Sequence, residues 1–244
     1  MFASQITSEE IETLPYAAFA GKITLVQKPE GVAAAVAHLA QQSVLGYDTE
    51  TRQSFTRGVH YGVSLLQLSS AEQAFLFRVD KIGIPEPLIS LLQNKSILKI
   101  GAAITDDIRG LQRIAAFRAQ GFVDLQKMTE AYGIQDKALK KMAAIVLGVR
   151  ISKSQQTSNW ALASYTAEQK LYAATDAWIC REIYQKLLDS SADISPIVAA
   201  SFVDMEKPKK TKPKPQSKPK SRSSAARRFS MMRRAQKSAS DLKK

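Results

Sequence analysis

Short apolar stretches in the first half of the chain show the alternation of apolar and polar residues that is typical of β-strands. We expect five strands, at residues 22–27, 44–50, 60–70, 72–80 and 96–103. The third and fourth of these follow each other across a short turn, which indicates an antiparallel pair. The others are separated by longer segments, which leaves room for crossover helices.

Between and after these strands, apolar residues recur three and four positions apart, the spacing of one helix face. The pattern predicts helices at residues 29–42, 85–94, 105–117, 122–133, 137–148 and 164–190. Strands gathered early, with helices between and after them, indicate an α/β fold with a mixed sheet flanked by helices. We find no internal repeat.

Charge divides the chain into a neutral body and a basic C-terminal tail. From Met205 onward there are 15 Lys and Arg and two acids, so the totals of 35 and 22 leave 20 basic and 20 acidic residues in 1–204. The net charge of +13 therefore belongs to the tail. We expect an N-terminal extension at 1–21, a single domain at 22–194 and a disordered tail rich in Lys, Pro and Ser at 195–244.

The basic residues of the tail indicate what kind of molecule it binds. Clustered Lys and Arg displace counterions from nucleic-acid phosphates, so we expect a contact with nucleic acid that is independent of sequence. A solubilising tail without a specific partner is the alternative. A membrane surface fits less well, because the tail lacks a strong apolar face.

Cysteine content and hydropathy limit the cellular setting. The single cysteine, Cys180, excludes a disulfide within the chain and a zinc site made of several cysteines. This composition fits a cytoplasmic protein. The first 15 residues are acidic and lack an apolar core, so we expect no signal peptide, and no apolar run is long enough for a membrane span.

Acidic residues occur in three places where a core or its margin is expected. Asp48 and Glu50 stand two apart on a strand and so share one face, where like charges repel. The pair Asp106–Asp107 begins a helix directly after the strand at 96–103, and Asp176 lies one helical turn after Tyr172. Each has a simpler interpretation: a turn residue, a helix cap or an exposed helical acid.

Taken together, these acids indicate a metal site. Several carboxylates without matching Lys or Arg require a cation if they are to lie together away from water. An all-oxygen ligand set favours Mg²⁺ or Mn²⁺, and two such ions suit the hydrolysis of a phosphodiester. A tyrosine at the same site can orient the attacking water through a hydrogen bond.

Three stretches carry a resemblance to a known family: GYDTET at 46–51, LKIGAAITDDIRGL at 98–111 and SNWALASYTAEQKLYAATDA at 158–177. In this order they resemble the motifs of the DEDD superfamily of 3′→5′ exonucleases, with ribonuclease D and the Werner-syndrome exonuclease domain as similar members. The resemblance covers roughly residues 22–190 and implies a ribonuclease H-like fold. It implies metal binding and catalysis by Asp48, Glu50, Asp107 and Asp176.

The third stretch also indicates the subtype. The histidine variant of the superfamily has His five residues before the last Asp, where this chain has Leu171. The tyrosine variant has Tyr four residues before it, which is Tyr172. The resemblance therefore implies a tyrosine-type enzyme in which Tyr172 orients the water.

The implied activity is the two-metal-ion removal of nucleoside 5′-monophosphates from single-stranded 3′ ends of DNA or RNA. By analogy Thr49 and Leu65 border the terminal nucleotide, and Lys153 contacts a backbone phosphate, unless it is only a solvated loop lysine. A binding protein or RNA-processing adaptor with little turnover, driven by the basic tail, is the alternative function. Oligomeric state, preferred metal and the choice between DNA and RNA stay open at this stage.

Overall fold

A single six-stranded sheet forms the centre of the domain, with the strand order β1-β4-β3-β2-β5-β6. The computed structural model describes residues 2–52, 61–190 and 195–208. The strands are β1 (Lys22–Val26), β2 (Val44–Thr51), β3 (Val63–Ser69), β4 (Gln73–Phe77), β5 (Leu98–Gly101) and β6 (Phe122–Asp124). Strand β3 runs antiparallel to both β2 and β4, and the remaining pairs are parallel. The predicted mixed sheet is therefore confirmed.

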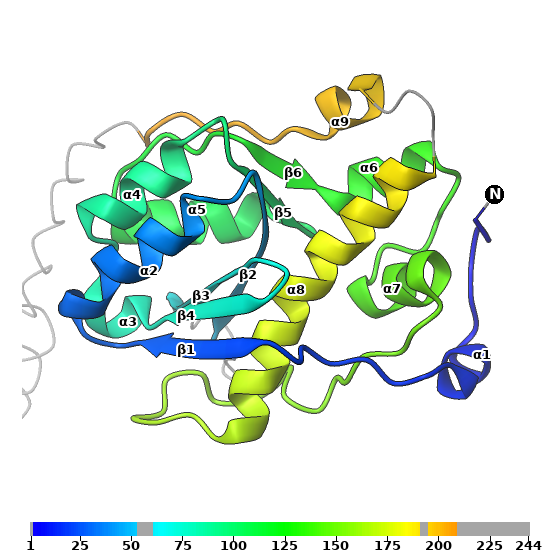
Figure 1. The fold of residues 1–244 in the computed structure, drawn as a ribbon, viewed down its shortest axis with the longest axis horizontal. Coiled ribbons are helices and arrows are strands. Elements are labelled where there is room, and N and C mark those ends of the chain that lie inside the picture. The colour runs from blue at the N-terminus through cyan, green and yellow to red at the C-terminus, as the bar shows by residue number, and fades with distance from the viewer. Residues whose placement is uncertain (1, 53–60, 191–194, 209–244) are drawn as a thin grey trace, which may run out of the picture. The chain divides into compact units, whose positions relative to one another are not determined.

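Helices cover both faces of this sheet (Figure 1). On one face, α2 (Val32–Leu39), α4 (Glu86–Gln93) and α5 (Thr105–Ile114) pack over a core that includes Leu66 and Leu68 of β3. On the other, the long helix α8 (Ala167–Asp189) packs over Leu65 and Leu76, with α7 (Leu139–Leu147) beside it. The remaining helices are η1 (Pro29–Gly31), α1 (Ser8–Thr13), α3 (Val79–Ile82), α6 (Leu125–Ala131) and α9 (Ser195–Ser201). The α/β architecture flanked by helices follows the prediction.

Strand β2 sorts its side chains between these two layers. Leu45 and Tyr47 are fully buried in the core beneath α2, α4 and α5. Gly46 and Asp48 point to the opposite face, because successive residues of a strand alternate. A Cβ atom at Gly46 would collide with the backbone carbonyl of Ala177 on α8. The glycine thus lets α8 lie directly on β2, which brings Asp48 against this helix.

The predicted helix at 122–133 is wrong in its first part. Phe122–Asp124 form β6, which pairs in parallel with β5, and the helix α6 begins only at Leu125. The Asp124 carboxylate accepts a hydrogen bond of 3.0 Å from the Gln126 N–H, so it caps this helix. These three residues pair with β5 at the edge of the sheet, and the stabilisation from this pairing outweighs the helical preference of the local sequence.

The C-terminal boundary also differs from the prediction. Residues 195–206, assigned to the tail from the sequence, include α9 and an extended segment along the edge of the sheet. The Val203 N–H donates to the Phe122 carbonyl at 2.9 Å, and Ala119 and Met205 exchange two backbone hydrogen bonds of 2.8 and 3.0 Å. The folded part therefore continues past residue 194. The rest of the predicted tail, from residue 209, lies outside the described residues.

The predicted N-terminal extension at 1–21 packs on the domain as well. The Ala17 N–H donates to the Arg150 carbonyl at 2.9 Å, and the Phe19 N–H donates to the Thr175 hydroxyl of α8 at 3.0 Å. No helix among the described residues is long and apolar enough to span a membrane.

Candidate active site

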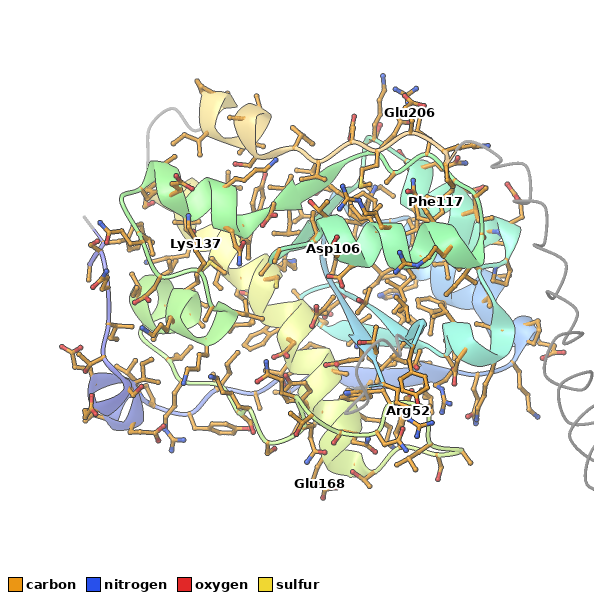
Figure 2. All side chains as sticks on the ribbon, turned by 180° about the vertical axis from the view of Figure 1, so that it is seen from behind. Arg52, Asp106, Phe117, Lys137, Glu168 and Glu206 are labelled. Carbon is orange, nitrogen blue, oxygen red and sulfur yellow. The ribbon has the colours of Figure 1, made fainter. Side chains whose placement is uncertain are left out.

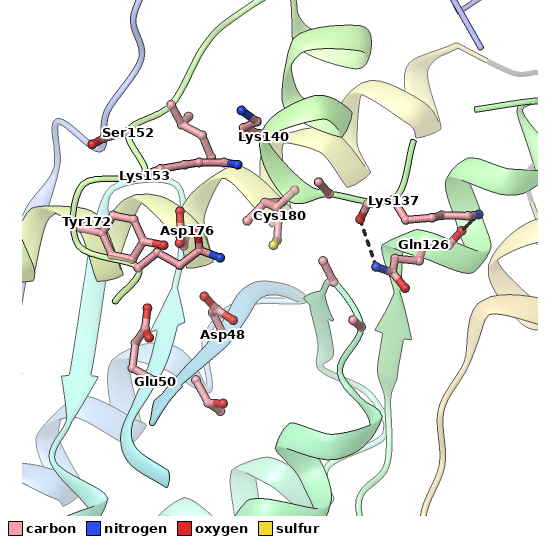
Figure 3. A pocket seen from close by; sticks show the side chains of 17 residues that line it. Asp48, Glu50, Gln126, Lys137, Lys140, Ser152, Lys153, Tyr172, Asp176 and Cys180 are labelled. Atoms are coloured by element: carbon pink, nitrogen blue, oxygen red, sulfur yellow. Dashed lines mark hydrogen bonds between the residues drawn. The ribbon is translucent and has the colours of Figure 1, made fainter. Parts of the chain in front are cut away.

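Strand β2 and helix α8 bring three carboxylates into one group. Asp48, Glu50 and Asp176 each have a carboxylate oxygen within 4.8 Å of the others (Figure 3). The first two share one face of β2, and Asp176 projects from the part of α8 that lies on this strand. Within the described ranges, no Lys or Arg forms an ion pair with any of the three. The group is therefore a cluster of acids that no basic side chain in the described ranges neutralises.

Burial and mutual repulsion disfavour ionisation of these acids. Burial, followed by the charges of Asp48 and Asp176, raises the pKa of Glu50 to about 10. Burial also raises the pKa of Asp176 to about 7, although a hydrogen bond from Tyr172 lowers it. The pKa of Asp48 is raised well above its usual range by burial and by the charges of Asp176 and Asp107. A bound cation would reverse these effects, because it stabilises the ionised form.

Asp107 belongs to α5, on the other face of the sheet from α8, and lies near the end of β2 that carries Asp48 and Glu50. Its carboxylate accepts a hydrogen bond of 2.8 Å from the Thr49 hydroxyl, which points away from Asp48 and Glu50 along the alternating strand. Burial raises the pKa of Asp107 to about 6, and the hydrogen bond from Thr49 lowers it. Asp107 lies outside the group of three within 4.8 Å.

The sequence motif selected Asp107 over Asp106, and the two residues differ accordingly. Asp106 is exposed and pairs with Arg109 at 2.9 Å on the outer side of α5 (Figure 2). Asp107 is half-buried and turned toward β2. Only Asp107 is therefore placed to take part in a site with Asp48.

Tyr172 lies one turn before Asp176 on α8, and its side chain is 9% exposed. Its ring packs against the fully buried Trp160, with the ring centroids 6.1 Å apart. Burial and the neighbouring Asp176 hold the pKa of the phenol far above 10. Tyr172 therefore stays protonated and acts as a hydrogen-bond donor, not as a base.

Asp48, Glu50, Asp176 and Tyr172 line a pocket of about 340 Å³, and Asp107 is not among its lining residues. Thr49 and the three carboxylates form one side of it, together with Tyr172. Cys180, one turn after Asp176, also borders the pocket; it is only 1% exposed, and burial raises the pKa of its thiol well above the usual value. The other side consists of the start of α7 and the loop after it, with residues Lys137, Ala138, Leu139, Lys140, Ile151, Ser152, Lys153 and Gln156.

The three residues predicted to bind substrate differ in their positions. Thr49 and Lys153 both line the pocket. Leu65 does not: it lies opposite Glu50 in the β2–β3 register and is fully buried in the apolar cluster that holds Trp160 and Tyr172. Its assignment to the terminal nucleotide, made by analogy, stays a prediction: Leu65 lies across from Glu50 on the same face of the sheet and packs beneath α8.

Sequence reasoning missed the basic side of the pocket apart from Lys153. Lys137 and Lys140 line it, yet their segment, KALKK, reads in the sequence as the solvated face of a helix. Only the packing of α7 beside α8 brings this segment across from Asp48. Sequence spacing carries no signal for such a contact.

Comparison with known proteins agrees with this geometry. The model of a 3′-5′ exonuclease family matches residues 23–191, which is more than half of the chain. Mouse WRN, a bifunctional 3′-5′ exonuclease and ATP-dependent helicase, is 34% identical over 155 residues, covering 61% of this chain and 11% of that protein. Ribonuclease D from Haemophilus influenzae is 31% identical over 156 residues, covering 62% and 38% of the two chains. The chain thus spans far less than two thirds of these relatives.

Solved structures share the fold. The exonuclease domain of Nibbler from Aedes aegypti superimposes with a TM-score of 0.67 at 22% identity, covering 77% of this chain and 100% of that one. Escherichia coli ribonuclease D superimposes with a TM-score of 0.62 at 23% identity, covering 69% and 44%. With the family match over residues 23–191, these likenesses lead to one conclusion: the chain belongs to the 3′-5′ exonuclease family.

Proposed function

We propose that this protein is a metal-dependent 3′→5′ exonuclease that removes nucleoside 5′-monophosphates from single-stranded ends of nucleic acid. The observation that carries the proposal is the group of Asp48, Glu50 and Asp176 in one pocket with the protonated Tyr172. Membership of the 3′-5′ exonuclease family supports the reaction type. Cytoplasmic residence stays a prediction.

The residues present fit divalent cations. Three carboxylates, of which Asp176 is buried and the other two are half-buried, have raised pKa values and no basic partner among the described residues, so they form a site that a hard cation stabilises. We propose that Asp48, Glu50 and Asp176, with Asp107 across β2, hold two Mg²⁺ or Mn²⁺ ions. When bound, such ions lower the pKa of water and offset the negative charge that develops on the phosphate and the leaving oxygen.

The chain's own groups position the reactants. The Tyr172 phenol donates a hydrogen bond that orients the attacking water, while its packing on Trp160 fixes the ring. The new bond forms between the water oxygen and the phosphorus of the last linkage. The bond from phosphorus to the 3′ oxygen of the preceding nucleotide breaks, and this oxygen receives a proton. The products are a nucleoside 5′-monophosphate and a strand shortened by one nucleotide.

Trypanosoma brucei ribonuclease D, with a TM-score of 0.66 at 20% identity, is known in complex with RNA U12, whereas DNA polymerase I of Aquifex aeolicus is 28% identical over 160 residues. We propose that the enzyme accepts single strands without sequence selection and that the basic tail adds affinity that decreases with salt. Parallel digestion of matched DNA and RNA strands measures the preference.

The central test uses 5′-labelled single strands of DNA and RNA with Mg²⁺ or Mn²⁺. Wild-type protein is expected to release mononucleotides and leave a ladder of shortened strands. Asp48→Asn is expected to lower the rate by about 10³-fold or more. Asp106→Asn is the matched control, because Asp106 is an exposed acid paired with Arg109, and it should retain the wild-type rate. No mononucleotide release by wild type, or full activity of Asp48→Asn, contradicts the proposal.

The tail separates this function from the alternative of a binding protein or adaptor. A chain that ends at residue 208 keeps the backbone pairing of Val203 and Met205 with the sheet edge. An exonuclease of this length should keep its kcat and show a raised KM, since only affinity is lost. A tail-driven binder should lose nearly all of its interaction with nucleic acid and show no turnover in either form.

A further inference from the structure

Two lysines stand together on the side of the pocket that lies opposite the carboxylates. Lys140 belongs to the first turn of α7, and Lys153 lies in the loop between α7 and α8. Both line the same pocket as Asp48 and Asp176. In Figure 3 the Lys153 side chain extends above Asp176, and Lys140 lies next to it, above Cys180.

The two ammonium groups are close enough to affect each other. Lys140, through a side-chain contact and its charge, lowers the pKa of Lys153, and Lys141 adds to this effect. Among the described residues no carboxylate forms an ion pair with Lys140 or Lys153. Two like charges therefore lie close together, and the described part of the chain supplies no counterion to them.

Neighbouring lysines show the opposite arrangement. Lys137 pairs with Glu130 at 2.9 Å, and Lys141 pairs with Asp136 at 2.8 Å. Of the four lysines at positions 137, 140, 141 and 153, only Lys140 and Lys153 have no carboxylate partner among the described residues. An anion placed between them would remove their repulsion and gain two charge-assisted contacts.

The reaction geometry identifies this anion, if the proposed function holds. The scissile phosphate must lie against Asp48, Glu50 and Asp176, from which both lysines are separated by more than ion-pair distance. A strand degraded from its 3′ end carries all its other phosphates on the 5′ side of the scissile linkage. We infer that Lys140 and Lys153 form a clamp for the phosphodiester immediately 5′ of the scissile one and so position the strand end at the carboxylates.

Lysine suits this role because its ammonium is a point charge that recognises phosphate without selecting a base. The clamp therefore adds affinity and alignment, and it leaves sequence preference unchanged. Lys140 is the new element here, since α7 supplies it from a helix that carries none of the acids. It is a positioning residue for the proposed reaction.

The test is a binding experiment in an Asp176→Asn background, which removes turnover. Fluorescent oligothymidylates carry one neutral methylphosphonate at the last, second-last or third-last linkage. With the all-phosphate strand, Lys140→Gln and Lys153→Gln should each weaken binding by roughly fivefold. The double variant should lower the salt dependence of log Kd by about 0.7 to 1.4. Lys141→Gln is the matched control on the same turn of α7 and should leave this slope unchanged.

The position of the neutral linkage decides the assignment. Both lysine substitutions should lose their effect when the second-last linkage is neutral and keep it when the last or third-last is neutral, as in a double-mutant cycle. Loss of the effect at another linkage, or an effect equal to that of Lys141→Gln, overturns the inference. Because binding is measured without turnover, these results stand apart from the mononucleotide assay, whose failure would overturn the proposed function instead.

Discussion

The Thr49 hydroxyl donates a hydrogen bond of 2.8 Å to the Asp107 carboxylate and so joins β2 to the first turn of α5. Thr49 stands between Asp48 and Glu50 in the sequence, yet it points to the opposite side of the strand. One strand therefore supplies two acids to the pocket and also the side chain that holds a third acid from another layer of the fold. Asp107 depends on Thr49 for its orientation.

Replacing Thr49 by Val should lower kcat about tenfold, because Val keeps the shape of the side chain and removes the donor to Asp107. Thr49→Ser, which retains the hydroxyl, should stay within about twofold of wild type. Steady-state kinetics on a single-stranded oligonucleotide measures both variants. Equal kcat values for Val and wild type would show that Asp107 needs no such support.

Replacing Tyr172 by Phe should lower kcat by about 10²-fold with little change in KM, since the ring packing on Trp160 remains and only the hydroxyl that donates to Asp176 or to the water is lost. Tyr184→Phe is the matched control, because Tyr184 is also buried on α8 but does not line the pocket. The rate should be measured from pH 6 to 9. If the rate of wild type depended on a titrating group in this range and the Phe variant lacked that dependence, the phenol would not stay protonated as inferred.

Replacing Asp176 by Asn should abolish activity and stabilise the metal-free protein. Burial of this carboxylate disfavours its ionised form, and the neutral amide removes that cost. We expect the free energy of unfolding in EDTA at pH 8 to rise by about 1 kcal/mol or more. Asp189→Asn, an exposed acid at the end of the same helix, should change it by only a few tenths of a kcal/mol. Urea titration measures both, and a less stable Asn variant would argue against the raised pKa.

The metal-free protein should lose stability as the pH rises from about 4 to about 7. The folded pKa values of Asp107 and Asp176, about 6 and about 7, exceed the unfolded value of 3.8. Between pH 4 and pH 7 the folded state therefore holds more protons than the unfolded state. The contribution of these two acids to the free energy of unfolding is greatest below pH 4 and declines as they ionise. Mg²⁺ or Mn²⁺ should flatten the decline. Urea titrations at several pH values, with EDTA or with metal, test this; a rise in stability over the same interval in EDTA contradicts it.

The sequence predicted the sheet and its helices well where periodicity extended over many residues. It failed at Phe122–Asp124, where only three residues form a strand and their pairing with β5 decides the structure. It also failed at residues 195–206, where backbone hydrogen bonds to Phe122 and Ala119 hold a short segment that lacks the Lys and Arg of the tail. Both errors concern contacts between residues distant in sequence.

The residues of the candidate site likewise fall into those that the sequence predicts and those that depend on how distant segments pack. Asp48, Glu50 and Asp176 were predictable because i, i+2 and motif spacing place them on known faces of β2 and α8. Lys140 was not, since its approach depends on how α7 packs. The assignment of Leu65 stays a prediction: the pairing register places it beside Glu50, and its side chain packs in the core beneath α8 without lining the pocket.

Cys180, buried one turn after Asp176 beneath the pocket, gives this protein an internal reporter. Its thiol is neutral and only 1% exposed, so we expect an alkylating reagent to react with it mainly in molecules where α8 has moved away from β2. Because Cys180 is the only cysteine in the chain, one labelling rate isolates this opening from all other motions. Occupation of the carboxylates by a cation that bridges strand and helix would slow the labelling, so the same thiol monitors how tightly the catalytic centre is closed.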